Sequence, residues 1–130
     1  MLFRSVDPTF DGAAQSLMAA FSGSLPIPTA IFCVNDVIAY GALRALTGLG
    51  IRVPDQVSVV GFDDLPSNDY MTPPLTSMTV SKHTIGQKSF QLLKARMDNP
   101  SKPSEKLLVG GELVIRQSVK DRNRSGGEHP

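Results

Sequence analysis

Hydrophobic positions along the chain follow two different periodicities. Consecutive apolar residues, many of them β-branched, occupy 29–34 and 57–62, as is typical of strands buried in a parallel sheet. Between these runs, apolar residues recur at helical spacing from Ile38 to Leu49, and Gly50 follows. This spacing predicts a helix that ends at the glycine. The order of strand, helix and strand predicts a βαβ unit with a right-handed crossover, and hence an α/β fold with a parallel sheet.

A further helix is predicted on each side of this unit. Asp7 is suited to cap a helix that has Pro8 in its first turn and whose apolar periodicity runs to Phe21. After the second strand, a short strand at 77–80 leads into another amphipathic segment, which stops before Asn99-Pro100.

The remaining segments have turn-forming composition. Residues 64–74 hold three prolines and no periodicity, which predicts a loop. Two short strand-like runs, 107–109 and 113–115, are separated by Gly110-Gly111, and this pair favours a bend between them. From residue 120 to 130 the chain is polar without apolar anchors, so a disordered tail is expected there.

Length and charge restrict the class of protein. A chain of 130 residues fits one domain, expected over 1–119, with a core of its own. Thirteen Lys and Arg against twelve Asp and Glu give a net charge of +1, and the basic residues are scattered, so no footprint for nucleic acid is visible. No apolar run approaches the ~20 residues that cross a bilayer, and the N-terminus does not read as a signal peptide. The expected compartment is the cytoplasm, without membrane contact.

Residues for metal or nucleophilic chemistry are few. Cys33 is the only cysteine and lies inside a predicted strand, where a thiol is usually a small buried hydrophobe. His83 is the only histidine outside the tail, and no Cys/His spacing suits zinc. No metal and no cofactor are expected.

Polar side chains follow both predicted strands at their C-terminal ends, where open α/β sheets bind ligands. Asp63 ends the second strand, and its carboxylate can accept bonds from two neighbouring hydroxyls of a sugar or nucleoside. Asp63 with Asp64 could equally cap the loop that follows. Asn35 can donate and accept, which suits hydroxyl recognition, whereas Asp36 better suits the N-cap of the next helix. Asp7 is open between capping and lining a pocket.

Several stretches taken together resemble one family. They are Pro28 to Leu46, Gly50 to Asp55, Val57 to Asp64, Pro73 to Thr76, and Leu113 to Ser118. In this order they resemble the lactose/galactose-repressor family of bacterial transcription regulators, and the resemblance covers nearly the whole chain. Departures are small: Gln56 stands where the family usually repeats Asp, and Ser77 and Val119 each replace a common Thr.

The resemblance implies a type I periplasmic-binding-protein-like effector domain, a three-layer α/β fold of two lobes with a small molecule between them. That molecule is often a sugar or a nucleobase. The chain looks like the C-terminal part of such a domain. A helix-turn-helix head, a hinge helix and most of the N-terminal lobe would precede Met1, so operator DNA would be bound only through parts absent here.

The resemblance also assigns residues. By family position, four fall where effector-pocket side chains lie: Asp63, Asn35, Asp7 and Lys82. Four others fall where family members form homodimers: Tyr40, Leu43, Arg44 and Met71. Tyr40 lies off the core stripe of its helix, where an exposed position or an interface is expected.

Three functions compete on the sequence. The first is the sensor part of a repressor, which is not an enzyme. The second is a sugar-binding protein of the same fold, which needs the signal peptide that is not seen. The third is a Mg²⁺-dependent phosphotransfer domain using Asp36, Asp63 and Asp64, for which no phosphate-binding loop is found. The motif match favours the sensor.

Overall fold

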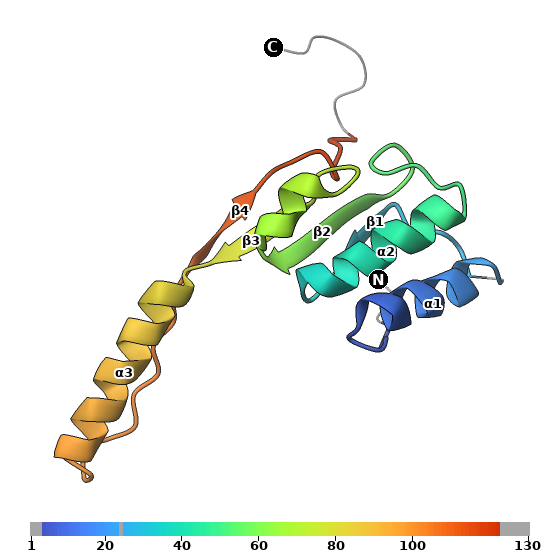
Figure 1. Ribbon diagram of the computed structural model, residues 1–130. Coiled ribbons are helices and arrows are strands. Elements are labelled where there is room, and N and C mark those ends of the chain that lie inside the picture. Colours follow the sequence, from blue (N-terminus) through green and yellow to red (C-terminus); the bar gives the residue numbers. More distant parts are fainter. Residues whose placement is uncertain (1–3, 24, 123–130) are drawn as a thin grey trace, which may run out of the picture.

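A computed structural model describes residues 4–23 and 25–122 and contains a four-stranded sheet (Figure 1). Its strands, in spatial and sequence order, are β1 (Ala30–Phe32), β2 (Ser58–Asp63), β3 (Thr76–Val80) and β4 (Gly111–Val114). The first three strands are parallel, and β4 runs antiparallel to β3. The predicted α/β class is confirmed, with one antiparallel strand at an edge of the sheet.

Two helices pack together beside the sheet. The helix α2 (Asp36–Gly48) connects β1 to β2, as the βαβ prediction requires, and α1 (Phe10–Phe21) packs against α2. A Cβ at Gly41 would lie 2.6 Å from the Phe10 carbonyl oxygen, so glycine at this position permits the close approach of the two helices. The expected start of α1 is corrected: Thr9, not Asp7, caps it by accepting the Gly12 N–H.

The core lies between α2, α1 and one face of the sheet. Alanines of both helices allow close packing, and larger residues fill the space toward the strands: Leu17, Ile38, Leu46, Val57, Val59 and Leu75. Cys33 belongs to this core, as predicted. Burial, with a smaller contribution from the nearby Asp36 carboxylate, raises the pKa of the Cys33 thiol to about 12. The thiol is therefore a protonated core group.

Leu43 does not lie where the dimer interpretation needs it. Its side chain is only 5% exposed and belongs to the hydrophobic core. The apolar spacing in the sequence predicts only the face of α2 that contacts the sheet. Because α1 packs on a second side of α2, the buried stripe is wider and includes Leu43. The prediction that Leu43 offers an exposed interface is wrong for this chain.

The opposite face of the sheet is uncovered within the described residues. The strand registers place five apolar residues on it: Phe32, Val60, Phe62, Met78 and Leu113. Phe32 is 64% exposed and Leu113 is 49% exposed. The helices α1 and α2 supply one layer on the other face (Figure 1), so this part of the chain has two of the three expected layers.

Beyond β3 the chain leaves the sheet. The helix α3 (Lys82–Asp98) projects away from it (Figure 1), and no residue of α3 is buried. The prediction of a strand at 107–109 is wrong. This segment returns beside α3 and lines a hollow with Ile85 and Leu92. The run 113–115 corresponds to β4, as expected.

Two other segments refine the predictions. The loop 64–74 contains a short 3₁₀ helix, η1 (Pro66–Tyr70), which the proline content alone did not indicate. The first tail residues are held: the Lys120 N–H donates to Ser58 Oγ at 3.2 Å, and Arg122 Nη2 donates to the Gln56 carbonyl at 2.5 Å. The rest of the predicted disordered tail, 123–130, lies outside the described residues.

Candidate functional site

Three of the four predicted pocket residues follow neighbouring parallel strands at one edge of the sheet. Asn35 comes just after β1, Asp63 is the last residue of β2, and Lys82 comes just after β3. The fold therefore places one amide, one carboxylate and one ammonium along the carboxyl ends of the strands, where this class of sheet binds ligands. We call this set of three residues the effector edge.

The backbone at the effector edge has an uncommon conformation. Asp63 has φ of 105° and Asp64 has φ of 47°, a region that residues with a side chain rarely adopt. Lys82 Nζ donates to the Asp63 carbonyl oxygen at 2.7 Å, which joins the end of β2 to the start of α3. Asp63 is half-buried and Lys82 is exposed. The Lys82 contact is to the backbone, and no bond of the described structure engages the Asp63 carboxylate.

Capping roles at α2 are exchanged relative to the sequence prediction. Asn35 is the N-cap, and its Oδ1 accepts the Ile38 N–H at 2.8 Å. Asp36, predicted to be the cap, is instead the first residue of the helix and is fully buried. Capping occupies the Asn35 oxygen and leaves its NH₂ group as the part that can face a ligand. Asp7 Oδ1 accepts the Thr9 N–H at 3.0 Å and so forms part of the turn before α1.

Asp36 is the centre of a buried polar network that sequence analysis missed. Its Oδ2 accepts the Leu65 N–H at 2.7 Å and Asn68 Nδ2 at 2.9 Å, and its Oδ1 accepts the Ser77 hydroxyl at 2.6 Å. Three hydrogen bonds compensate the loss of hydration of the buried carboxylate. One sequence signal was available: Gly61 interrupts the β-branched run of β2 next to this carboxylate.

Arg116 is a second residue that the sequence reading left out. Its guanidinium donates to Asp64 Oδ1 at 2.8 Å, to Asp69 Oδ1 at 2.6 Å and to the Leu75 carbonyl at 3.0 Å. Burial alone would lower the pKa of Arg116, but the bonds with Asp69 and Asp64 outweigh it and raise the pKa above its usual value. The arginine after β4 therefore ties the loop that follows β2 to the far edge of the sheet.

The predicted interface residues differ in their surroundings. The Tyr40 hydroxyl donates to Asn68 Oδ1 at 2.8 Å, and both Tyr40 and Met71 are partly buried against the core. Arg44 is exposed, pairs with Asp11 at 2.8 Å and lies over the Phe10 ring, 5.2 Å from its centroid. Tyr40, Arg44 and Met71 retain accessible surface, in contrast to Leu43.

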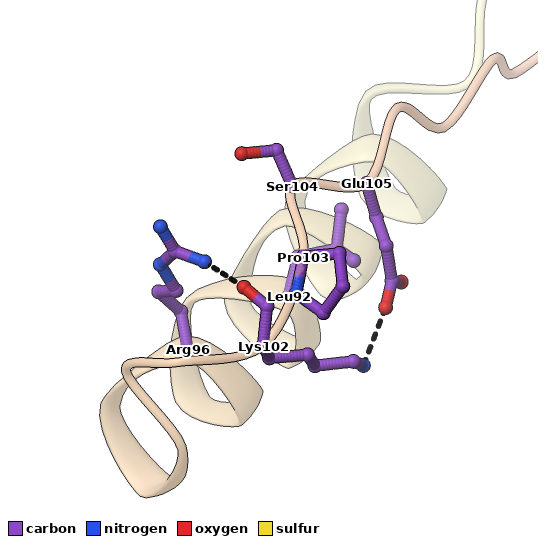
Figure 2. Close-up of a pocket in the computed structure, with 6 residues that line it drawn as sticks. All are labelled: Leu92, Arg96, Lys102, Pro103, Ser104 and Glu105. Atoms are coloured by element: carbon purple, nitrogen blue, oxygen red, sulfur yellow. Dashed lines mark hydrogen bonds and ion pairs between the residues drawn. The ribbon is translucent and has the colours of Figure 1, made fainter.

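Two hollows of the described surface lie beside α3. One of about 220 Å³ is bounded by Leu92 and Arg96 of α3 and by residues 102–105 of the returning segment. Figure 2 shows two contacts at its wall: Arg96 donates to the Lys102 carbonyl, and Lys102 Nζ pairs with Glu105 at 2.5 Å. This hollow is the space between α3 and the irregular segment that returns beside it.

The acidic residues do not form a magnesium site. Asp36 accepts three bonds in the core, and Asp64 is paired with Arg116. Within residues 4–23 and 25–122, no group of three or more His, Cys, Asp or Glu side chains is placed to hold a metal ion. The saturation of Asp36 removes the ligand that the phosphotransfer interpretation needs.

Comparison with known proteins agrees with this geometry. Residues 2–119 match the family of the periplasmic binding protein-like domain. The chain belongs to this family. In the part of the chain that the structure describes, no helix is long and apolar enough to span a membrane.

Sequence relatives of this periplasmic binding protein-like chain are regulators. It is 44% identical over 93 residues to the HTH-type transcriptional repressor PurR of Mannheimia succiniciproducens, covering 72% of this chain and 28% of that protein. It is 38% identical over 96 residues to the PurR of Photobacterium profundum, covering 74% and 29%. The chain thus spans less than a third of the length of these repressors, which are not enzymes.

Several solved structures with the same fold are LacI-family regulators. One from Arthrobacter, in complex with lactose, has a TM-score of 0.75 at 28% identity, covering 88% of this chain and 43% of that one. Another, from Enterococcus faecalis with bound ribose, has a TM-score of 0.75 at 29% identity, covering 88% and 42%. The resemblance to the lactose/galactose-repressor family is confirmed, and this periplasmic binding protein-like chain is a fragment of a LacI-family effector-binding domain.

Proposed function

We propose that the chain is the C-terminal part of the effector-sensing and dimerisation domain of a cytoplasmic transcriptional regulator, and that the effector edge binds a sugar or a related polyhydroxy compound. The observation that carries the proposal is the convergence of Asn35, Asp63 and Lys82 at the carboxyl ends of three adjacent strands. One lobe provides one wall of a cleft, which fits a chain that spans 28% of a related repressor.

Asp63 is the principal recognition residue of this proposal. Its carboxylate accepts hydrogen bonds only, and two adjacent hydroxyls can donate to its two oxygens. The end of β2 and the Lys82 contact to the Asp63 carbonyl fix the backbone before a ligand arrives, so little ordering is needed on binding. Asn35 contributes an NH₂ donor that can face a ring or hydroxyl oxygen. Asp7, engaged in the turn before α1, stays a weaker candidate.

A sugar is favoured over a nucleobase by the chemistry of the edge and by its neighbours. Sugars are rich in paired hydroxyl donors, which match a carboxylate and an amide. The related regulators of known structure hold lactose and ribose, and another such regulator, CelR, holds cellobiose. A planar base is typically held by stacking on an aromatic ring or a guanidinium plane, and none of Asn35, Asp63 and Lys82 provides one.

The same proposal assigns two macromolecular contacts. Tyr40, Arg44 and Met71 form the homodimer surface, and Leu43 supports it from inside the core. Operator DNA is bound only by a helix-turn-helix head outside this chain, since a net charge of +1 offers little attraction to phosphates.

The test uses a restored two-lobed protein. A chimera joins the N-terminal part of the Mannheimia PurR to this chain, and lactose, ribose, cellobiose and a set of nucleobases are titrated by calorimetry. The sugar that binds should lose roughly 10- to 100-fold in affinity in Asp63→Asn, as expected for one charge-assisted contact. The control is Asp55→Asn, an exposed carboxylate paired with Lys120 away from the effector edge. Unchanged sugar affinity in Asp63→Asn, or binding of a nucleobase alone, would contradict the assignment.

A further inference from the structure

We infer that Asp36 is a positioning residue for the effector edge: its buried carboxylate holds the backbone of Asp63 and Asp64 in the conformation that presents the Asp63 side chain. The inference rests on the proposed role of Asp63, but its structural part can be tested without a ligand. Asp36 touches no ligand position itself, because its side chain is fully buried beneath β2.

The backbone N–H groups of Asp64 and Leu65, the two residues after Asp63, are both connected to the Asp36 carboxylate by hydrogen bonds. The Leu65 N–H donates directly to Asp36 Oδ2 at 2.7 Å. The Asp64 N–H donates to Ser77 Oγ at 3.2 Å, and this hydroxyl donates in turn to Asp36 Oδ1 at 2.6 Å. One carboxylate therefore receives both N–H groups, one directly and one through a single hydroxyl.

The conformation that these bonds hold is unfavourable without support. Asp63 and Asp64 have φ of 105° and 47°, and such residues keep these angles only where their surroundings fix them. Asn68 adds a further tie, because its Nδ2 group donates to Asp36 Oδ2 at 2.9 Å and lies 3.4 Å from Asp64 Oδ1. If the bonds to Asp36 are lost, both residues can relax to ordinary negative φ, which turns the Asp63 side chain away.

A carboxylate is required at this position, and an amide of the same shape is not equivalent. The Asp36 oxygens accept three donors, whereas an asparagine has one oxygen and presents an NH₂ group in place of the other. That NH₂ group would face either the Leu65 N–H and the Asn68 NH₂ group, which only donate, or the Ser77 hydroxyl, which would have to accept where it now donates. The first turn of α2 also favours a negative charge, because its free N–H groups give the helix N-terminus a partial positive charge.

Two variants separate this positioning role from a general structural one. Asp36→Asn should weaken the hydrogen-exchange protection of the Leu65 or the Asp64 N–H, and it should shift the Cα and coupling signals of Asp63 and Asp64 toward negative φ in NMR spectra of the 130-residue chain. Ser77→Ala removes only the hydroxyl that connects the Asp64 N–H to Asp36. It should therefore reduce the hydrogen-exchange protection of the Asp64 N–H at least tenfold and leave that of the Leu65 N–H unchanged. The selective effect of Ser77→Ala keeps the test valid where Asp36→Asn unfolds.

The matched control is Leu46→Ala, a core deletion in the same helix ~15 Å from Asp36 along its axis. It lowers thermal stability but should leave the Asp63 and Asp64 signals in place. The inference is overturned if both angles stay positive in folded Asp36→Asn, or if Ser77→Ala leaves the Asp64 N–H protected.

Binding gives an independent readout. Whichever of lactose, ribose and cellobiose binds the two-lobed chimera should bind with about tenfold lower affinity in Asp36→Asn. Leu46→Ala should leave that affinity unchanged. If none of these sugars binds the chimera while Asp36→Asn still relaxes Asp63, the proposed function fails and the positioning role of Asp36 stands. If Asp63→Asn weakens the sugar but Asp36→Asn changes neither affinity nor spectra, the proposed function stands and this inference fails.

Discussion

Gly61 lies directly against the carboxylate of Asp36, and the missing side chain of one residue makes room for the buried charge of the other. A Cβ built at Gly61 would overlap Asp36 Oδ1 and come within 3.1 Å of Leu75 Cδ2. The strand β2 and the helix α2 can pack at this point only while position 61 has no side chain.

Gly61→Ala should therefore destabilise the protein, although alanine suits a strand no worse than glycine. Overpacking at a filled site costs about 1–3 kcal/mol, and displacement of Asp36 from its donors would add to that cost. Urea unfolding followed by circular dichroism measures the change. Gly86→Ala is the control, because no atom lies within 4 Å of a Cβ there and alanine favours the helix. Equal midpoints for Gly61→Ala and the parent chain would contradict the packing relationship.

Leu43→Asp should unfold the chain and not merely dissociate a dimer. The side chain is 5% exposed within one chain, so an aspartate there buries an unpaired charge and costs about 3 kcal/mol or more. Thermal unfolding should show a large loss at any protein concentration. Arg44→Ala removes only the exposed pair with Asp11 at the adjacent position, and its cost is expected below about 1 kcal/mol. A folded, monomeric Leu43→Asp protein would restore the interface interpretation.

The stability of the fold should fall in alkaline solution because of Cys33. Burial raises the pKa of this thiol from 9.0 to about 12, so the unfolded chain releases a proton that the folded chain retains. The contribution is fully present below pH 9 and is lost between pH 9 and 12, at up to about 1.4 kcal/mol for each pH unit. Tyr40, whose pKa burial also raises, acts in the same direction above pH 10.

Denaturant unfolding of the parent chain and of Cys33→Ala, from pH 8 to 10, measures the effect. The free energy of unfolding should fall more steeply with pH for the parent than for the variant. Parallel curves for the two proteins would show that the thiol titrates at its ordinary value. At pH 8 the native thiol should also resist alkylation that proceeds readily in urea.

The uncovered face of the sheet should cause self-association. Phe32 and Leu113 are 64% and 49% exposed, and the flanking residues Val60, Phe62 and Met78 extend the apolar surface. Sedimentation velocity at tens of micromolar, roughly the range in which such surfaces associate, should detect dimers or larger species. Phe32→Lys should reduce them, and Arg44→Ala should not. A clean monomer of the parent chain at this concentration would count against the prediction.

Segments whose contacts are local were predicted from the sequence, and residues whose contacts are distant were not. The strands, α2 and the end of α1 follow from the pattern of apolar positions, because that pattern is local in the sequence. Leu43 was misplaced because the packing of α1 on α2 gives that helix a second buried side. The run 107–109 has strand composition, but no neighbouring strand pairs with it in the described structure.

At the effector edge, too, features with local contacts were predictable from the sequence and those with distant contacts were not. The position of Asp63 at the end of β2 could be predicted, because the end of a strand is visible in a β-branched run. The sequence predicts only a capping role for Asp36, because its three donors come from Leu65, Asn68 and Ser77, far away along the chain. Arg116 likewise reaches Asp64 and Asp69 across the sheet, and its position in the sequence gives no sign of these partners.

The excursion between β3 and β4 leaves and re-enters the sheet at a single point, because Val80 pairs with Gly111 in the antiparallel ladder. Everything from 81 to 110, including α3, is topologically one long hairpin loop. Each doubling of the length of a flexible loop adds only about 0.6 kcal/mol of closure entropy, so the ladder tolerates an insert of this size. Residues 81–110 are accordingly a segment that can be replaced. A two-residue turn from Val80 to Gly111 would make an ordinary hairpin. A foreign domain whose termini lie close together could be inserted at the same place.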